Sequence, residues 1–129
     1  METKELAFAV MACGGELVQG SPAVKFQRVN TDSRQAQAGD LFVALSGERF
    51  DGHEFLKEVA EKGAAAVLVE KGRSLPALPD CVVIRVANPR HAYGQIGAAY
   101  RKEFAIPVIA VGGSNGKTST KELIAAVLR

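Results

Sequence analysis

Apolar runs of strand length alternate with amphipathic segments along this chain, and the two patterns predict strands and helices in turn. The clearest runs are continuous and rich in β-branched residues, which is typical of strands buried on both faces of a sheet. They cover residues 41–45, 65–69, 82–86 and 106–111. Shorter strand candidates lie at residues 16–19 and 25–29, on either side of a Gly-Ser-Pro turn.

Four segments carry apolar residues at helical spacing, and we expect a helix in each of them. They cover residues 4–12, 54–62, 89–104 and 117–128. Asp51 is placed to cap the second helix, and Gly63 is placed to end it. In the third helix, Asn88 suits the N-cap and Pro89 the first helical position.

This alternation of strands and helices predicts an α/β fold. We place a domain boundary near residues 104–107, because Pro107 resets the chain after the third helix. Residues 1–105 would form an N-terminal domain, and residues 106–129 would begin a nucleotide-binding domain. One strand and one helix cannot form a sheet, so we expect the chain to be the N-terminal piece of a longer protein. The alternative is a small complete domain whose final helix packs back on its own core.

The segment between the 106–111 run and the last helix has the composition of a phosphate-binding loop. It contains Gly113, Ser114, Asn115, Gly116, Lys117, Thr118 and Ser119. Glycines let backbone N–H groups close around a polyphosphate, and the following helix presents its positive end to the anion. Lys117 can reach phosphate oxygens, and the Thr118 hydroxyl can bind Mg²⁺. Val111 stands where the usual pattern has glycine, so the alternative is a plain glycine turn with Lys117 in solvent.

Composition and charge exclude several classes of protein. Of the 129 residues, 47% are hydrophobic and 23% are charged, which allows a sizeable core. A net charge of +2 gives no reason to expect a nucleic-acid or membrane partner, and no apolar stretch is long enough to span a membrane. Cys13 and Cys81 lie far apart in apolar surroundings, so we interpret them as reduced core thiols of a cytoplasmic protein rather than a disulfide.

Three stretches of the chain together resemble the start of a Mur ligase, one of the ATP-dependent amino-acid ligases of bacterial cell-wall precursor synthesis. They are the phosphate loop, the Thr31-Asp32-Ser33-Arg34 segment and the run of residues 39–53. The resemblance covers residues 29–129 and implies three cooperating domains. The first would hold the UDP end of the substrate, the second ATP, and the third the incoming amine. ATP would phosphorylate a peptide carboxylate, and the amine would attack the acyl phosphate.

Within this family, Ser114 and the sequence of residues 120–122 favour members that add D-alanyl-D-alanine to UDP-N-acetylmuramoyl-tripeptide. The alternatives are a related ligase that adds a diamino acid, or a stand-alone nucleotide-binding module. The resemblance implies that residues 113–119 bind ATP, with Lys117 catalytic and Thr118 on Mg²⁺. It places the remaining metal ligands and the amine-binding domain beyond Arg129, so we expect this chain to be inactive alone, and monomeric.

On the substrate side, the resemblance directs attention to two polar segments that follow predicted strands. The first contains Thr31, Asp32, Ser33 and Arg34, which could hydrogen-bond uracil or a phosphate. The alternative is a turn in which Asp32 or Ser33 caps its own backbone while Arg34 is solvated.

The second segment is the loop of residues 47–53. Gly47 allows close backbone approach, Arg49 could meet a pyrophosphate, and Phe50 could stack on uracil. We expect binding mainly through Arg49, and the alternative is an ordinary surface loop with Phe50 tucked beneath it. His53 and His91 are interpreted as polar residues near helix starts, and Tyr93 and Tyr100 as core residues of one helix face.

Overall fold

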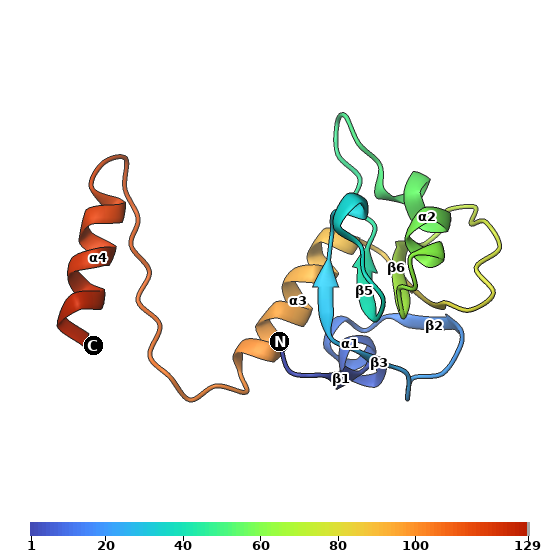
Figure 1. Cartoon of the computed structure of the whole chain (residues 1–129), viewed down its shortest axis with the longest axis horizontal. Coiled ribbons are helices and arrows are strands. Elements are labelled where there is room, and N and C mark those ends of the chain that lie inside the picture. The colour runs from blue at the N-terminus through green and yellow to red at the C-terminus, as the bar shows by residue number, and fades with distance from the viewer. Residues whose placement is uncertain (129) are drawn as a thin grey trace.

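A five-stranded mixed sheet forms the centre of the computed structural model, which describes residues 1–128 (Figure 1). The strands of this sheet lie in the order β2 (Glu16–Gln19), β7 (Val82–Val86), β6 (Ala66–Glu70), β5 (Asp40–Val43) and β4 (Arg28–Asn30). Neighbours pair in parallel from β4 to β7, and β2 runs antiparallel to β7. A small antiparallel sheet joins β1 (Lys4–Glu5) to β3 (Lys25–Phe26).

Side chains of the central strands alternate between two hydrophobic cores, one on each face of the sheet. Leu41 and Val43 of β5 belong to the first core, and Phe42 between them belongs to the second. Helices α1 (Leu6–Cys13) and α3 (Pro89–Arg101) cover the first face, and α2 (Leu56–Glu61) covers the second. The predicted α/β class is confirmed, as three layers of helix, sheet and helix.

The strands predicted at residues 16–19 and 82–86 have the expected bounds, but the one predicted at 25–29 is divided. The chain passes at Gln27 from the small sheet, where β3 pairs with β1, into the central sheet, where β4 pairs with β5. The predicted helix at 54–62 begins as a 3₁₀ turn, η2 (Gly52–Phe55), which Asp51 caps by accepting a hydrogen bond from the His53 N–H. A second 3₁₀ turn, η1 (Ser33–Gln35), follows β4.

Helix α3 starts as predicted but ends three residues early, at Arg101. Its buried residues are Pro89, Ala92 and Ile96. Tyr93 lies at the edge of this face and is 42% exposed, so its assignment to the core was wrong. Tyr100 is half-buried, and its ring packs edge-to-face on Phe104 with the centroids 5.0 Å apart.

The strand predicted at residues 106–111 is not formed within residues 1–128. This segment runs beside α4 (Lys117–Leu128), away from the sheet (Figure 1). Ile106, Val108 and Ile109 are each more than half exposed. A strand needs a neighbour for its backbone hydrogen bonds, and none lies beside this segment in the described part of the chain. The helix α4 has its predicted bounds, whereas a domain boundary at residue 105 stays a prediction.

Both cysteines are free thiols, as the sequence predicted. Cys81 is buried in the second core, and this burial raises the pKa of its thiol to about 11. The side chain therefore stays protonated at neutral pH and acts as a small apolar residue.

Candidate functional site

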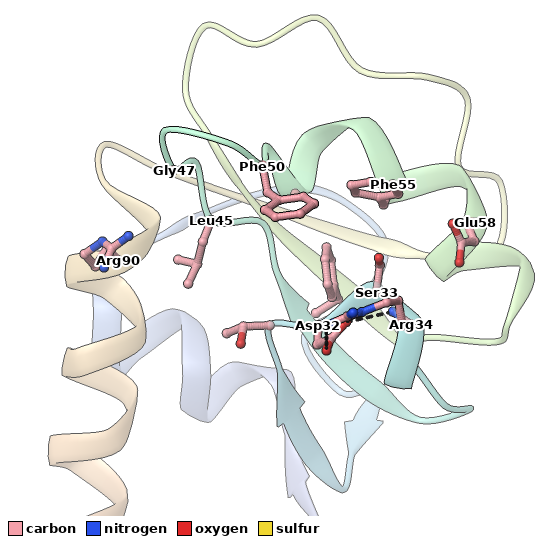
Figure 2. Close-up of a pocket in the computed structure, with 12 residues that line it drawn as sticks. Asp32, Ser33, Arg34, Leu45, Gly47, Phe50, Phe55, Glu58 and Arg90 are labelled. Atoms are coloured by element: carbon pink, nitrogen blue, oxygen red, sulfur yellow. Dashed lines mark hydrogen bonds and ion pairs between the residues drawn. The ribbon is translucent and has the colours of Figure 1, made fainter.

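A pocket of about 460 Å³ opens at the carboxyl ends of β4 and β5 (Figure 2). The carboxyl ends of parallel strands meet at one edge of a sheet, so the segments that follow the two strands come together there. All of the substrate-side candidates except Arg49 line this pocket. They are Thr31, Asp32, Ser33, Arg34, Gly47 and Phe50.

The first wall of the pocket is a tight turn that starts where β4 ends. The Asn30 side chain accepts a hydrogen bond from the Asp32 N–H at 2.9 Å, and Asp32 in turn caps η1 by accepting one from the Arg34 N–H at 3.0 Å. The Arg34 guanidinium also pairs with the Asp32 carboxylate at 2.9 Å. These hydrogen bonds from Arg34 lower the pKa of Asp32. The self-capping turn considered from sequence is therefore present, and it lies on a pocket wall.

A buried carboxylate holds this turn against the sheet. Asp40, at the start of β5, is 2% exposed and accepts two hydrogen bonds from the Arg28 guanidinium, at 3.0 and 2.6 Å. It also accepts one from the Gln37 N–H at 2.9 Å. A buried charge is costly unless it is paired. The same network reaches the turn, because Arg28 Nη2 donates to the Gln35 carbonyl at 2.6 Å and Asn30 Nδ2 donates to Asp40 at 3.4 Å.

The second wall is the loop that follows β5. The Gly47 N–H donates to the Phe50 carbonyl at 2.7 Å, and the Gly52 N–H donates to the Leu45 carbonyl at 2.8 Å. A Cβ at Gly52 would come within 2.9 Å of both Ala44 Cα and the Leu45 nitrogen, so only glycine fits there. Phe50 lines the pocket while remaining 74% exposed, so it is not tucked beneath the loop.

Arg49, the residue expected to dominate binding, is not among the residues that line the pocket, and its role in binding stays a prediction. The hydrogen bond between Gly47 and Phe50 closes a tight turn, and Glu48 and Arg49 form its exposed tip. The turn directs the flanking residues toward the pocket and leaves Arg49 outside it.

Several lining residues were not singled out from the sequence. They are Phe42, Leu45, Gly52, Phe55, Glu58 and Arg90. Arg90 lies in the first turn of α3, shortly after β7, another parallel strand that ends at the same edge of the sheet. That position was the available signal for Arg90, because residues after successive parallel strands share one edge.

Charge is unevenly distributed around the pocket. Arg34 is paired with Asp32, and Glu58 is paired with Lys62 at 2.9 Å. Within residues 1–128, the Arg90 side chain makes no hydrogen bond or ion pair. Figure 2 shows Arg90 on the α3 side of the pocket, and Phe55 and Glu58 on the α2 side. The pocket therefore has an aromatic end and a cationic end.

His53 is a buried structural residue rather than a base. Its Nδ1 lies 2.7 Å from Asp51 Oδ1, and its Nε2 accepts a hydrogen bond from the Glu70 N–H at 3.0 Å. Both ring nitrogens are thus used, which agrees with its interpretation as a polar residue near a helix start. His91 lies in the first turn of α3, and its N–H donates to the Asn88 side chain at 3.1 Å.

The proposed phosphate loop has the backbone of a glycine turn that leads into a helix. Gly113 and Gly116 have φ angles of 133° and 76°, in the region that favours glycine. A Cβ at either position would meet nothing closer than 3.9 Å, so conformation rather than space requires glycine. Helix α4 begins at Lys117, and the Thr120 N–H closes its first turn on the Gly116 carbonyl at 3.0 Å. A turn of this kind, followed at once by a helix N-terminus, suits an anion.

The part of the chain that the structure describes holds no group of three or more His, Cys, Asp or Glu residues arranged to bind a metal ion. None of the helices within residues 1–128 has the length and apolar character needed to cross a bilayer.

Comparison with known families and curated sequences gives consistent matches. The model of the Mur ligase family, catalytic domain, matches residues 25–111. The UDP-N-acetylmuramoyl-tripeptide–D-alanyl-D-alanine ligase of Synechocystis sp. is 45% identical over 84% of this chain and 24% of its own length. The UDP-N-acetylmuramoyl-L-alanyl-D-glutamate–2,6-diaminopimelate ligase of Cytophaga hutchinsonii is 31% identical over 100% of this chain and 26% of its own. The chain thus spans about a quarter of the length of these relatives.

Solved structures agree with the sequence matches. The UDP-N-acetylmuramoylalanyl-D-glutamyl-2,6-diaminopimelate–D-alanyl-D-alanyl ligase of Acinetobacter baumannii superposes with a TM-score of 0.88 at 37% identity, covering 99% of this chain and 28% of that one. The MurF ligase of Thermotoga maritima in complex with ADP superposes with a TM-score of 0.69 at 32% identity. That match covers 79% of this chain and 23% of the other.

Proposed function

The chain belongs to the Mur ligase family, and on that premise we propose that the full-length protein is an ATP-dependent ligase that adds D-alanyl-D-alanine to UDP-N-acetylmuramoyl-tripeptide. The observation that carries this proposal is the pocket at the carboxyl edge of β4 and β5. It gathers the Thr31–Arg34 turn and the Gly47–Phe50 loop, two segments that were assigned to the substrate side separately.

We assign this pocket to the uridine diphosphate end of the substrate. Phe50 and Phe55 supply flat apolar surfaces suited to a pyrimidine ring, and Ser33 beside them supplies a hydroxyl for its polar edge. Arg90 at the other end supplies an unpaired guanidinium, which suits the two phosphate groups. The base would therefore lie toward α2 and the diphosphate toward α3.

We assign ATP to the glycine turn at Gly113, Ser114, Asn115, Gly116, Lys117, Thr118 and Ser119. The ADP complex of the Thermotoga relative supports a nucleotide site in this family. ATP would supply the phosphoryl group that activates the peptide carboxylate. The Lys117 ammonium would neutralise phosphate charge, and the Thr118 hydroxyl would bind Mg²⁺. Residues 106–129 would then begin the central domain, after an N-terminal domain of residues 1–105.

This 129-residue chain should not catalyse ligation alone, because a complete site also needs an acidic metal ligand and a pocket for the adenine. We expect a cytoplasmic monomer that works on small molecules without a nucleic-acid or membrane partner. Relatives named as diaminopimelate ligases are also similar, at 31%, 38% and 37% identity, so a ligase for a diamino acid is the second candidate.

A ligation assay on the full-length protein tests the proposal and separates the two candidates. With UDP-N-acetylmuramoyl-tripeptide, ATP and Mg²⁺, we expect ADP release that depends on D-alanyl-D-alanine. ADP release that instead requires UDP-N-acetylmuramoyl-dipeptide and a diamino acid would transfer the assignment to the second candidate. If neither pair of substrates causes ADP release, both candidates are contradicted.

A further inference from the structure

The pocket loop of residues 47–50 is held at its base by a cluster of polar side chains, none of which lines the pocket. The cluster consists of Ser46, Asp51, His53 and Arg73, and we refer to it as the Arg73 latch. Ser46 and Asp51 stand on either side of the loop, where they form an isolated β-bridge and a hydrogen bond of 3.2 Å between their side chains.

Arg73 reaches both sides of this base from a distant part of the chain. It lies in the connection between β6 and β7, and its Nη1 donates to Asp51 Oδ2 while its Nη2 donates to Ser46 Oγ at 2.9 Å. Its Nε lies 3.5 Å from the Glu70 carboxylate. A planar guanidinium with several fixed donors can hold two acceptors at once, which an ammonium group cannot do with the same geometry.

His53 ties the same carboxylate to the sheet. Its N–H donates to Asp51 Oδ1 at 3.0 Å, and its ring Nδ1 lies 2.7 Å from that oxygen. Because its Nε2 accepts from the Glu70 N–H, the proton of the neutral ring is assigned to Nδ1, which donates to Asp51. The ring is 6% exposed. The latch therefore joins the loop base to the end of β6 and to the connection that follows it.

The Phe50 side chain has little burial of its own, so its position depends on how the base of its loop is held. Its side chain is 74% exposed, and its carbonyl is fixed by the Gly47 N–H within the loop itself. The Gly52 N–H bond to the Leu45 carbonyl also joins the two sides of the loop, and Arg73 adds the link from Ser46 and Asp51 to the connection between β6 and β7. Burial opposes the ionisation of Asp51, but hydrogen bonds from His53 and Arg73 outweigh it and lower the pKa of this carboxyl. Asp51 thus stays charged and paired at neutral pH.

We propose that Arg73 is a positioning residue for the pocket: by bridging Ser46 and Asp51, it holds Phe50 in place as the aromatic wall. The expected effect of Arg73 on ligand affinity rests on the proposed function, in which the pocket takes a uridine nucleotide. The expected effect of Arg73 on the order of the loop rests on geometry alone. Without the guanidinium, the two sides of the loop keep the Ser46–Asp51 side-chain bond and their backbone hydrogen bonds. They lose the bridge to the connection between β6 and β7, and we expect Phe50 to become more mobile.

The test uses the 129-residue chain, with amide relaxation by NMR and calorimetric titration with uridine and with UDP. For Arg73→Ala we expect faster or larger motion at the Gly47 and Phe50 amides. Affinity for both ligands should fall about tenfold, which corresponds to about 1.4 kcal/mol. Arg73→Lys should recover part of the affinity, because it restores the positive charge but not the planar guanidinium that bridges two acceptors. Lys71→Ala is the matched control, since it removes a nearby exposed cation outside the latch.

Each result decides one part of the proposal. Unchanged affinity and unchanged loop motion in Arg73→Ala would overturn it. If the wild-type chain binds neither uridine nor UDP, the proposed ligand is wrong, and the relaxation of Gly47 and Phe50 still decides whether the latch orders the loop. If Arg73→Ala does not fold, Ser46→Ala removes one of the two acceptors with less disturbance, and a loop as rigid as the wild type would then contradict the latch.

Discussion

Arg90 is the side chain on which the proposed orientation of the ligand depends. It lines the pocket from the first turn of α3, and within residues 1–128 its guanidinium has no hydrogen-bond or ion-pair partner. Arg34 is also on the pocket wall, but the Asp32 carboxylate already neutralises it. A free guanidinium beside a partly apolar cavity is suited to a phosphate group, because a charge-assisted Arg–phosphate hydrogen bond is stronger than one between neutral groups.

Replacing Arg90 should therefore affect the affinities for uridine and for UDP differently, although both ligands contain the same base. For Arg90→Ala we expect the affinity for UDP to fall by about tenfold, while the affinity for uridine stays unchanged. Calorimetric titration of both ligands measures this difference. Equal losses for uridine and UDP would show that Arg90 does not act through the phosphates.

Gly52 sets how closely the pocket loop approaches β5. A Cβ there would lie 2.9 Å from the Ala44 Cα, and backbone atoms cannot move aside as a side chain can. We expect Gly52→Ala to lower the free energy of unfolding by roughly 1–3 kcal/mol, as overpacking does elsewhere.

Gly94 gives the matched control for Gly52. It lies in α3, and a Cβ there would meet nothing within 4 Å. Gly94→Ala should raise the free energy of unfolding by roughly 0.5–1 kcal/mol, because alanine is the better helix former. Urea unfolding measures the change in the free energy of unfolding for both variants. Changes of the same sign and size would contradict the packing argument.

Asp51 makes stability depend on pH. Its pKa in the folded chain lies below the ordinary value of 3.8, because hydrogen bonds from His53 and Arg73 outweigh the burial that opposes ionisation. A depressed carboxyl pKa contributes stability above the unfolded value, and that contribution is lost as the pH falls below it. The free energy of unfolding of the wild type should therefore drop between about pH 5 and pH 2. Asp51→Asn should be less stable at pH 6 and show a shallower drop, and a drop as steep as that of the wild type would refute this role.

At the scale of elements, α4 differs from the other α-helices within residues 1–128 in lacking a buried residue. Leu123, Val127 and Leu128 are 69%, 83% and 68% exposed, and together with Ile109 they line an apolar groove. Helix α3, by contrast, buries three residues against the sheet. Most helical stability in proteins comes from packing rather than from intrinsic propensity.

The amides of residues 121–128 should consequently exchange with solvent much faster than those of β6. Strand β6 is buried on both faces and hydrogen-bonded on both edges, so its amides should open only with global unfolding. Hydrogen-exchange NMR on the 129-residue chain provides the comparison. Slow exchange throughout residues 123–128 would show that α4 has a packing partner that the structure does not reveal.

Sequence reasoning worked best for elements whose apolar pattern is long and whose ends are marked. Strand β7 and the N-terminus of α3 fall where the β-branched run and the Asn88-Pro89 pair placed them. The segment 106–111 has the same β-branched character, yet it forms no strand in the described part of the chain. An apolar, β-branched pattern indicates that a segment prefers to be buried. A strand also requires a neighbouring strand for its backbone hydrogen bonds, and the local sequence does not show whether one is present.

At the scale of the whole molecule, the pocket could be predicted in part, for a topological reason. Thr31–Arg34 and Gly47–Phe50 follow strands that proved to be parallel neighbours, so they meet at one edge. Arg90 follows β7 and shares that edge, but finding it required the parallel pairing of β5, β6 and β7. The position of Arg49 outside the pocket lining could not be predicted, because the tight turn between Gly47 and Phe50 is set by the fold around it.

The match of the Acinetobacter ligase over 99% of this chain includes α4 and the extended segment before it. Those residues therefore adopt a similar arrangement in a chain that is more than three times as long. This agrees with an exposed apolar groove along α4, and we propose that the rest of the central domain covers the groove in the full-length protein.

The most direct test of the central claim is an amide-shift NMR titration of this chain with UDP-N-acetylmuramoyl-tripeptide, with ATP and Mg²⁺ as a separate arm. We predict saturable shifts at Thr31–Arg34, Gly47, Phe50 and Arg90 for the sugar nucleotide, and shifts at Gly113–Ser119 for ATP alone. Shifts from both ligands confined to residues 113–119 would contradict the assignment of the pocket, because they would show a loop that accepts any phosphate and a cavity that accepts no uridine.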